Sequence, residues 1–405
     1  MNKKVVFLLI VLTVLLYAWP PGQWFHTGGT TVTHFAEVPS SSSSIHGGGE
    51  PFKEEEFINE PGNMQVHAAS IAELKDNTLA AVWYSGQYEG APDTRIYFTT
   101  RASTPGASWT PPAGIVDRAS ASQELNRYIK KIGNPLVFTD QDDRLVLLFV
   151  SVSVGGWSGS SLNMKVSSDK GKTWSRSQRL TLSPFFNVSE LVRNNPLRLT
   201  NGGVMVPIYH EFIGIFSELL WLRPGDGEHA PVYFKTRMTW GTQYLQPDIV
   251  GLTPNSAAAF FRGSRSKSRV ALSLSDDAGE TWTTPQYFDL PNPGSGLNAL
   301  LLSDGRILLA FNDSSSDRHN LTLAISNKGY KGLTEHTEYT ERQGKKFQIW
   351  QRAAVLENTP GEEFSYPYML RTSDGKIHLV YTWQRKRIKH IVFNEEWIEK
   401  NLSDE

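Results

Sequence analysis

The chain has 405 residues and a formal net charge of −1, so it carries no overall field that would attract nucleic acid or an anionic membrane. It contains no cysteine, which excludes disulfides, thiolate metal sites and cysteine nucleophiles. Hydrophobic residues make up 39% of the chain and aromatic residues 11%, a composition that suits a packed globular protein and excludes a mainly disordered one.

An apolar segment stands at the N-terminus. Lys3 and Lys4 precede the run VVFLLIVLTVLLYAW (5–19), which predicts an export signal. A cleavable signal usually ends in small residues, whereas this run ends in Ala-Trp-Pro-Pro, so residues 1–21 are expected to be a signal peptide or an uncleaved membrane anchor. Residues 22–50 are rich in glycine and serine and predict a flexible linker.

The rest of the chain repeats one phrase six times, at intervals of roughly 50 to 70 residues, a length that fits one four-stranded antiparallel sheet with its loops. Each copy is a polar residue, an apolar strand, a turn rich in Asp, Asn or Gly, and a second apolar strand. Such sheets are the repeating unit of a β-propeller. We therefore predict an all-β fold, a six-bladed propeller at residues 51–405. The copies open at His67, Asn134, Asn195, Gln246, Asn298 and Tyr366.

These six opening residues are candidates for a binding site. The first strand of each propeller blade lines the central channel, so the six side chains are expected to form a polar ring around one pocket. The alternative is that they merely begin strands, since Asn favours turns.

A second motif occurs twice, as KVSSDKGKTW at 165–174 and SLSDDAGETW at 273–282. The Asp side chain can accept hydrogen bonds from turn N–H groups, Gly can adopt a positive φ, and Trp can fill the gap between sheets. These roles need no substrate, so the motif indicates architecture. Degenerate copies are expected at 102–109 and 326–332.

The two motifs resemble the Asp boxes of the sialidase (neuraminidase) superfamily, also called bacterial neuraminidase repeats, and the six phrases resemble its six-bladed fold from about residue 60 to 394. Segments such as YEGAPDTRIYF and YPYMLRTSDGKIHLVYTW look most like the bacterial predicted-neuraminidase branch. The resemblance implies an exo-glycosidase for a terminal 2-keto sugar acid. Such an enzyme needs arginines for the sugar carboxylate, a Tyr nucleophile with a carboxylate base, and an acid for the leaving oxygen.

Three residues match the family's motif. Tyr366, which opens the sixth phrase, matches the nucleophile; the alternative is a strand tyrosine with a satisfied hydroxyl. Arg318 and Arg262 match two of the carboxylate-binding arginines. For Arg262 the alternative is a solvated surface residue, since Arg265 and Arg269 lie close by in the sequence.

Two positions depart from the family's pattern. His67 stands where the family has its first arginine, and Gln246 stands where the family has the glutamate partner of the tyrosine. A glutamine cannot take a proton from tyrosine at neutral pH. Either Glu211 substitutes for it or classical sialidase activity is absent, and His67 is a candidate base or, when protonated, a carboxylate contact.

The leaving-group acid is expected in the loop after the second strand of the first blade, where Glu89 and Asp93 are both candidates; the alternative is an exposed or turn-capping carboxylate. Arg385, Arg387 and Lys389 alternate along a predicted strand of the last blade, which puts them on one face. That face is either solvated or a second anion contact, with Arg387 as the candidate substrate-binding residue.

Two functions follow. The first is hydrolysis of a terminal α-linked 2-ulosonic acid, sialic acid or a relative such as Kdo, by an exported protein that is anchored in the inner membrane facing the periplasm, or is secreted or periplasmic. The second is a catalytically inactive propeller that binds acidic glycans or a protein partner. We expect no cofactor, no metal and no bound nucleic acid. The N-terminal segment is expected to contact the membrane, and a membrane protein is a candidate partner.

Overall fold

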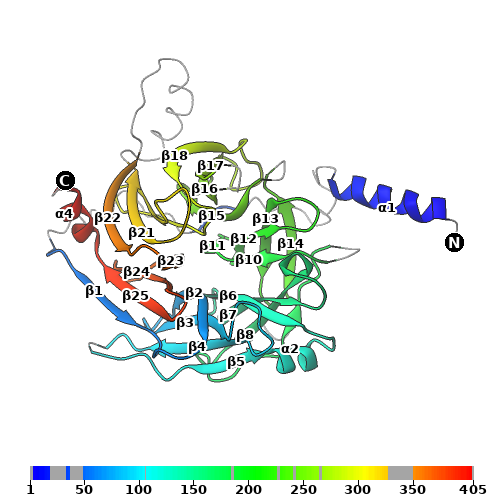
Figure 1. Cartoon of the computed structure of the whole chain (residues 1–405), viewed down its shortest axis with the longest axis horizontal. Coiled ribbons are helices and arrows are strands. Elements are labelled where there is room, and N and C mark those ends of the chain that lie inside the picture. The colour runs from blue at the N-terminus through cyan, green and yellow to red at the C-terminus, as the bar shows by residue number, and fades with distance from the viewer. Residues whose placement is uncertain are drawn as a thin grey trace, which may run out of the picture.

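The computed structural model describes residues 3–18, 33–36, 49–104, 106–183, 187–225, 229–239, 243–263, 267–326 and 350–403. Six antiparallel sheets surround a central axis, with their first strands innermost (Figure 1). This arrangement confirms the predicted six-bladed propeller. Most of the predicted linker, and residues 327–332 of the degenerate motif expected at 326–332, lie outside the described residues.

The blades follow one another along the chain. Blade 1 contains β2 (Gln65–Glu73), β3 (Leu79–Gly86), β4 (Arg95–Arg101) and β5 (Ala113–Asp117). Blade 2 contains β6 (Lys131–Thr139), β7 (Leu145–Val152), β8 (Ser160–Ser167) and β9 (Gln178–Arg179). Blade 3 contains β10 (Leu191–Val192), β11 (Leu197–Arg198), β12 (Val204–His210), β13 (Phe216–Arg223) and β14 (Val232–Arg237).

The second half repeats this order. Blade 4 contains β15 (Leu245–Gly251), β16 (Ala257–Arg262), β17 (Arg269–Ser275) and β18 (Gln286–Pro291). Blade 5 contains β19 (Asn298–Leu301), β20 (Ile307–Phe311), β21 (Asn320–Ser326) and β22 (Trp350–Asn358). Blade 6 contains β23 (Phe364–Arg371), β24 (Ile377–Trp383), β25 (Arg387–Phe393) and, as its outer strand, β1 (Lys53–Phe57).

The ring is closed by a strand from the other end of the chain. β1 pairs antiparallel with β25, from Lys53 opposite Phe393 to Phe57 opposite Lys389, and Figure 1 shows the blue strand beside the red one. The second strands are buried along their whole length in several blades, as in β7, because each sheet is covered on both faces by its neighbours. The apolar cores therefore lie between blades.

The Asp-box motifs lie between the third and fourth strands of blades 2 and 4. In the first, Asp169 accepts hydrogen bonds from the backbone N–H of Thr173 at 2.9 Å and from the Ser167 hydroxyl at 2.8 Å, and Asp277 makes the corresponding bonds. A Cβ on Gly171, where φ is +84°, would lie 2.1 Å from the ring of Phe98 in blade 1. The motif is therefore structural, as predicted.

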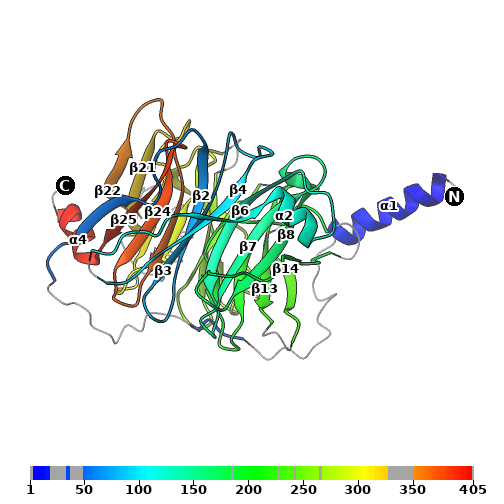
Figure 2. The same cartoon turned by 90° about the horizontal axis from the view of Figure 1, so that it is seen from below.

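The helices are peripheral: α1 (Lys3–Ala18), α2 (Arg118–Glu124), α4 (Glu395–Ser403) and the short 3₁₀ turn η1 (Trp157–Gly159). Figure 2 shows α1 outside the ring of blades. Among the described helices, none has the length and apolar character needed to cross a membrane. Within the predicted linker, Phe35 is buried and forms a β-bridge with Leu199 of blade 3, so this part of the linker makes a fixed contact.

Candidate functional site

The site begins with a bulge that four inner strands share. The pairing of the first strand with the second strand shifts register between His67 and Ser70 in blade 1, and between Ser365 and Tyr368 in blade 6. The same shift occurs in blades 2 and 4. In each bulge one residue has a positive φ of 44° to 55°, which is uncommon outside glycine and typical of functional sites. These residues are Ala68, Asn134, Gln246 and Tyr366.

The bulges show that the prediction for blade 1 was wrong, because His67 is not the counterpart of Tyr366. The position that corresponds to Tyr366 and Gln246 is Ala68, and His67 is the residue before it. The prediction failed because AAS after His67 gives no sequence sign of where the extra residue of a bulge lies. We call the end of the propeller at which these bulges lie the channel mouth; the Asp boxes lie at the opposite end, since β8 ends where β7 begins.

Tyr366 lies among cationic and aromatic groups at the channel mouth. Its ring is perpendicular to that of His67, with ring centroids 4.6 Å apart. The guanidinium carbons of Arg193 and Arg318 lie 5.3 Å and 5.5 Å from its ring centroid. Arg193 is buried and donates hydrogen bonds to the backbone carbonyls of Tyr366 and Ala69, so it braces the bulges of blades 6 and 1.

His67 is neutral in this environment. Burial, reinforced by the positive charge of Arg385, lowers the pKa of His67 to about 3. Both ring nitrogens are buried without a hydrogen-bond partner among the described residues, and Nε2 lies 3.8 Å from Oε2 of Glu89, too far for a hydrogen bond. His67 is therefore an uncharged contact of Tyr366 and does not supply a cation for a substrate carboxylate.

Gln246 lies near Tyr366 at the channel mouth. Its Oε1 accepts a hydrogen bond from Arg262 at 2.9 Å, and its Nε2 donates to the hydroxyl of Tyr209 at 3.0 Å. A Cβ on Gly296 would lie 2.9 Å from Tyr366 Cδ1 and 3.4 Å from Gln246 Oε1, so both side chains border the same small space. Asn134 donates to the same Tyr209 hydroxyl at 3.4 Å.

Glu363 links two arginines of adjacent blades. Its Oε1 lies 3.1 Å from an amino nitrogen of Arg318, and its Oε2 lies 2.7 Å from Nε of Arg385. Burial acts to raise the pKa of Glu363, but the hydrogen bond from Arg385 and the charges of both arginines outweigh burial and lower the pKa to about 2. Glu363 is therefore a carboxylate throughout the physiological range.

The other candidate carboxylates occupy different places. Glu89 lies 3.5 Å from Arg385 and is partly exposed, in the loop that borders His67. Burial raises the pKa of Glu211, an effect that the charge of Arg262 opposes. Both oxygens of Asp93 accept the backbone N–H of Gln87 at 3.3 Å, so this carboxylate braces its own loop.

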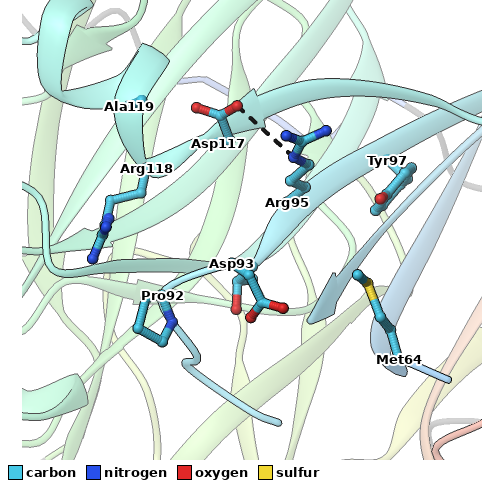
Figure 3. A pocket seen from close by; sticks show the side chains of 9 residues that line it. Met64, Pro92, Asp93, Arg95, Tyr97, Asp117, Arg118 and Ala119 are labelled. Atoms are coloured by element: carbon cyan, nitrogen blue, oxygen red, sulfur yellow. Dashed lines mark ion pairs between the residues drawn. The ribbon is translucent and has the colours of Figure 1, made fainter. Parts of the chain in front are cut away.

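Asp93 also lines a pocket of about 420 Å³ on blade 1, shown in Figure 3. Arg95 and Asp117 form an ion pair of 3.9 Å across it, and Met64 and Tyr97 give it an apolar side. Neither Tyr366 nor the arginines around it line this pocket. It is a feature distinct from the channel mouth.

Asn195 and Asn298 do not belong to the open ring that the sequence predicts. Asn298 is buried and donates to Asn195 at 2.8 Å, while the two side chains bond the backbone carbonyl and N–H of Met369 at 2.7 Å and 2.6 Å. These asparagines tie blades 3, 5 and 6 together inside the channel. The predicted ring was too large. Neither asparagine has the positive φ of the four bulge residues, because the pairing of the inner strand is unbroken in blade 5 and the inner strand of blade 3 is interrupted between β10 and β11.

Arg387 lies outside the cluster: its Nε donates to the carbonyl of Asn59 at 2.9 Å and its guanidinium covers the ring of Phe57 at 3.7 Å. Arg385 belongs to the turn before β25 and reaches the mouth instead. The site residues that were not predicted from the sequence are Arg193, Tyr209 and Glu363. The available signal for Arg193 was its position two residues before Asn195, which opens the third phrase.

Comparison with known proteins places this geometry in a family. The model of the BNR repeat-like domain matches residues 77–379. The chain belongs to the BNR repeat-like domain family. No curated protein matches this BNR repeat-like chain.

Several solved structures share its fold. A protein of unknown function from Dyadobacter fermentans has a TM-score of 0.63 and 14% identity, over 84% of this chain and 98% of that one. The Hadza microbial sialidase Hz136 has a TM-score of 0.62 and 14% identity, over 81% of this chain and 65% of that one. The intramolecular trans-sialidase from Ruminococcus gnavus, in complex with oseltamivir carboxylate, has a TM-score of 0.62 and 15% identity, over 82% and 95%. The BNR repeat-like protein therefore has the sialidase-like propeller fold that the Asp boxes indicate.

Proposed function

We propose that this BNR repeat-like protein is an exo-glycosidase that hydrolyses a terminal α-linked 2-ulosonic acid, sialic acid or a relative such as Kdo. The observation that carries the proposal is the position of Tyr366, next to a neutral His67 and two guanidiniums at the open end of the channel. Cationic groups around a neutral nucleophile suit an anionic sugar, because an ionised carboxylate nucleophile would be repelled by the sugar's own charge.

Arg318 and Arg262 bind the sugar carboxylate in this proposal, since each has guanidinium N–H groups beyond those bound to Glu363 or Gln246. The hydroxyl oxygen of Tyr366 attacks the anomeric carbon as the glycosidic C–O bond breaks, and the leaving oxygen takes a proton from Glu89. Water then attacks the same carbon, returns a proton to Glu89 and releases the tyrosine. Asp93 is the weaker candidate acid, because its oxygens are bonded to its own loop.

The proton of Tyr366 goes to His67 or Glu211, and returns to the tyrosine oxygen when water releases the tyrosine from the sugar. The ring of His67 is in contact with Tyr366, whereas burial gives Glu211 a raised pKa and hence a greater affinity for the proton. Asn134 and Gln246 shape the sugar pocket through the hydroxyl of Tyr209.

A second function is favoured by one observation. The amide of Gln246 is bonded at both ends and cannot accept a proton, so the site lacks a carboxylate where the sialidase resemblance implies one. A catalytically inactive propeller that binds an acidic glycan or a protein partner would keep the arginines and have no use for a base.

The experiment is hydrolysis of fluorogenic sialosides and Kdo glycosides by the full chain and by Tyr366→Phe. Release of either sugar acid by the native chain and its loss in the variant are expected. Binding of a glycan without turnover across the panel would refute hydrolysis and support the second function. We also propose that the protein is exported, either held at the inner membrane by its N-terminal segment or released; fractionation of cells that express the full chain tests this.

A further inference from the structure

Glu363 binds two arginines, Arg318 and Arg385, and the proposed function gives a role only to Arg318. Arg318 comes from the loop before β21 in blade 5, whereas Arg385 comes from the turn between β24 and β25 in blade 6. Each occupies one oxygen of the same carboxylate, at 3.1 Å and 2.7 Å. One anion thus fixes two guanidiniums from adjacent blades on the same side of the channel mouth.

The backbone of Arg385 is held firmly. Gln384 and Arg385 both have positive φ, 54° and 56°, and the N–H of Lys386 bonds the carbonyl of Trp383 at 2.9 Å, which defines a two-residue hairpin turn. The carbonyl of Arg385 in turn accepts the N–H of Val66 from blade 1 at 2.9 Å. The turn is therefore fixed at the junction of blades 6 and 1, and the guanidinium leaves it toward the mouth.

Arg385 retains unused hydrogen-bonding capacity. Its Nε bonds Glu363, one amino nitrogen lies 3.5 Å from Glu89, and the other amino nitrogen has no hydrogen bond within the described part of the chain. Its side chain is 30% exposed and that of Arg318 is 23% exposed. Both guanidiniums can therefore reach a ligand in the channel mouth while staying bound to Glu363.

The bulge of blade 1 carries a small residue. The bulge position of blade 1 holds Ala68, which has no side chain beyond Cβ, whereas the same position in blade 6 holds Tyr366. Arg385 and His67 border the same carboxylate oxygen: an amino nitrogen of Arg385 lies 3.5 Å, and Nε2 of His67 3.8 Å, from Oε2 of Glu89. Blade 6 thus supplies a cation where the bulge of blade 1 supplies none.

We propose that Arg385 binds the carboxylate of the substrate together with Arg318, and that Glu363 is the positioning residue that holds both guanidiniums. This inference rests on the proposed function and adds a third arginine, from blade 6, to the two named there. Two guanidiniums fixed on one carboxylate favour a ligand with a planar carboxylate, which each can bind through charge-assisted hydrogen bonds. The methyl ester of the same sugar has no ionised carboxylate, so it cannot form these charge-assisted hydrogen bonds.

The test measures binding by calorimetry with the full chain. The probes are N-acetylneuraminic acid and Kdo, each as the free acid and as the methyl ester. Arg385→Gln is expected to weaken binding of the free acid about 10- to 100-fold, the range for a lost hydrogen bond between charged groups, and to leave ester binding unchanged. Arg385→Lys keeps the positive charge but loses the paired N–H groups of the guanidinium. Its affinity for the free acid is expected to lie between those of the native chain and Arg385→Gln. Lys386→Gln, an exposed neighbour in the same turn, is the matched control and is expected to bind as the native chain does.

Glu363→Gln gives a second measurement. It removes the anion that positions both arginines, so the acid is expected to bind more weakly and the difference between acid and ester to shrink, which a merely structural role would not produce. If Arg385→Gln binds the acid as the native chain does, or weakens acid and ester equally, the inference is wrong while the proposed function stands. If the native chain binds neither acid, the proposed function itself fails and the inference fails with it.

Discussion

Replacing one amide by a carboxylate tests the reasoning about Tyr366 most directly. Gln246→Glu keeps the size of the side chain and its backbone at φ 50°. Oε1 would still accept from Arg262, now as a charged pair at about the present 2.9 Å. The other oxygen would face the hydroxyl of Tyr209, which can turn from acceptor to donor because a hydroxyl does both, and can still accept from Asn134.

The expected gain follows from this geometry. The carboxylate would border the same space as Tyr366, where a base can take the phenolic proton. A well-placed general base contributes about 10²- to 10⁴-fold to turnover. We expect kcat on the best glycoside of the panel to rise at least about 100-fold, with a thermal midpoint close to that of the native chain, since every hydrogen bond of Gln246 is replaced.

The assay is steady-state hydrolysis beside two controls. Gln246→Ala removes the side chain without adding a base and is expected to lower turnover, and Gln246→Glu combined with Tyr366→Phe is expected to be inactive. If the folded variant gains nothing, or gains as much without the tyrosine hydroxyl, then Tyr366 is not a nucleophile that a carboxylate at position 246 can activate.

Three further predictions concern the fold and the site. Gly296→Ala places a Cβ 2.9 Å from the ring of Tyr366, so it should weaken sugar binding and cost about 1–3 kcal/mol of stability; native affinity in calorimetry would show that the space is not the sugar pocket. Burial lowers the pKa of His67 and of His378 to about 3 from 6.5, so at these histidines the unfolded chain binds more protons between these values. The thermal midpoint of the native chain should therefore fall more between about pH 6.5 and pH 4 than that of His378→Gln; equal falls contradict this. Gly171→Ala, at positive φ and against an aromatic ring, should lower the thermal midpoint and leave sugar binding intact; loss of binding at full stability would mean that the Asp box contributes to the site.

The fold could be predicted from the sequence because its signals are local and repeated. The Asp box needs Ser, Asp, Gly and Thr at fixed spacing, since each residue makes a specific bond of one turn. The six phrases likewise repeat two strands and a turn. Tyr366 was found because it opens a phrase.

The detail of the site depended on features that do not appear in the sequence. Asn134 and Asn298 open similar phrases, but a bulge exposes the first at the mouth, whereas the second is buried and bonded to Asn195. The pairing of Glu363 with Arg385 joins the segment before β23 to the turn between β24 and β25, which come together only when these strands pair. Sequence spacing does not indicate which arginine faces the channel.

The closing strand has a consequence for how the protein is made. Among the strands that the structure describes, β1 is synthesised first and its partner β25 last. Blade 6 cannot be completed until nearly the whole chain has left the ribosome, so the ring stays open during synthesis with β1 and the last finished blade exposed as unpaired edges. Folding should therefore end in one late, cooperative step, and a truncation that removes β25 should leave β1 without its partner and the ring unclosed.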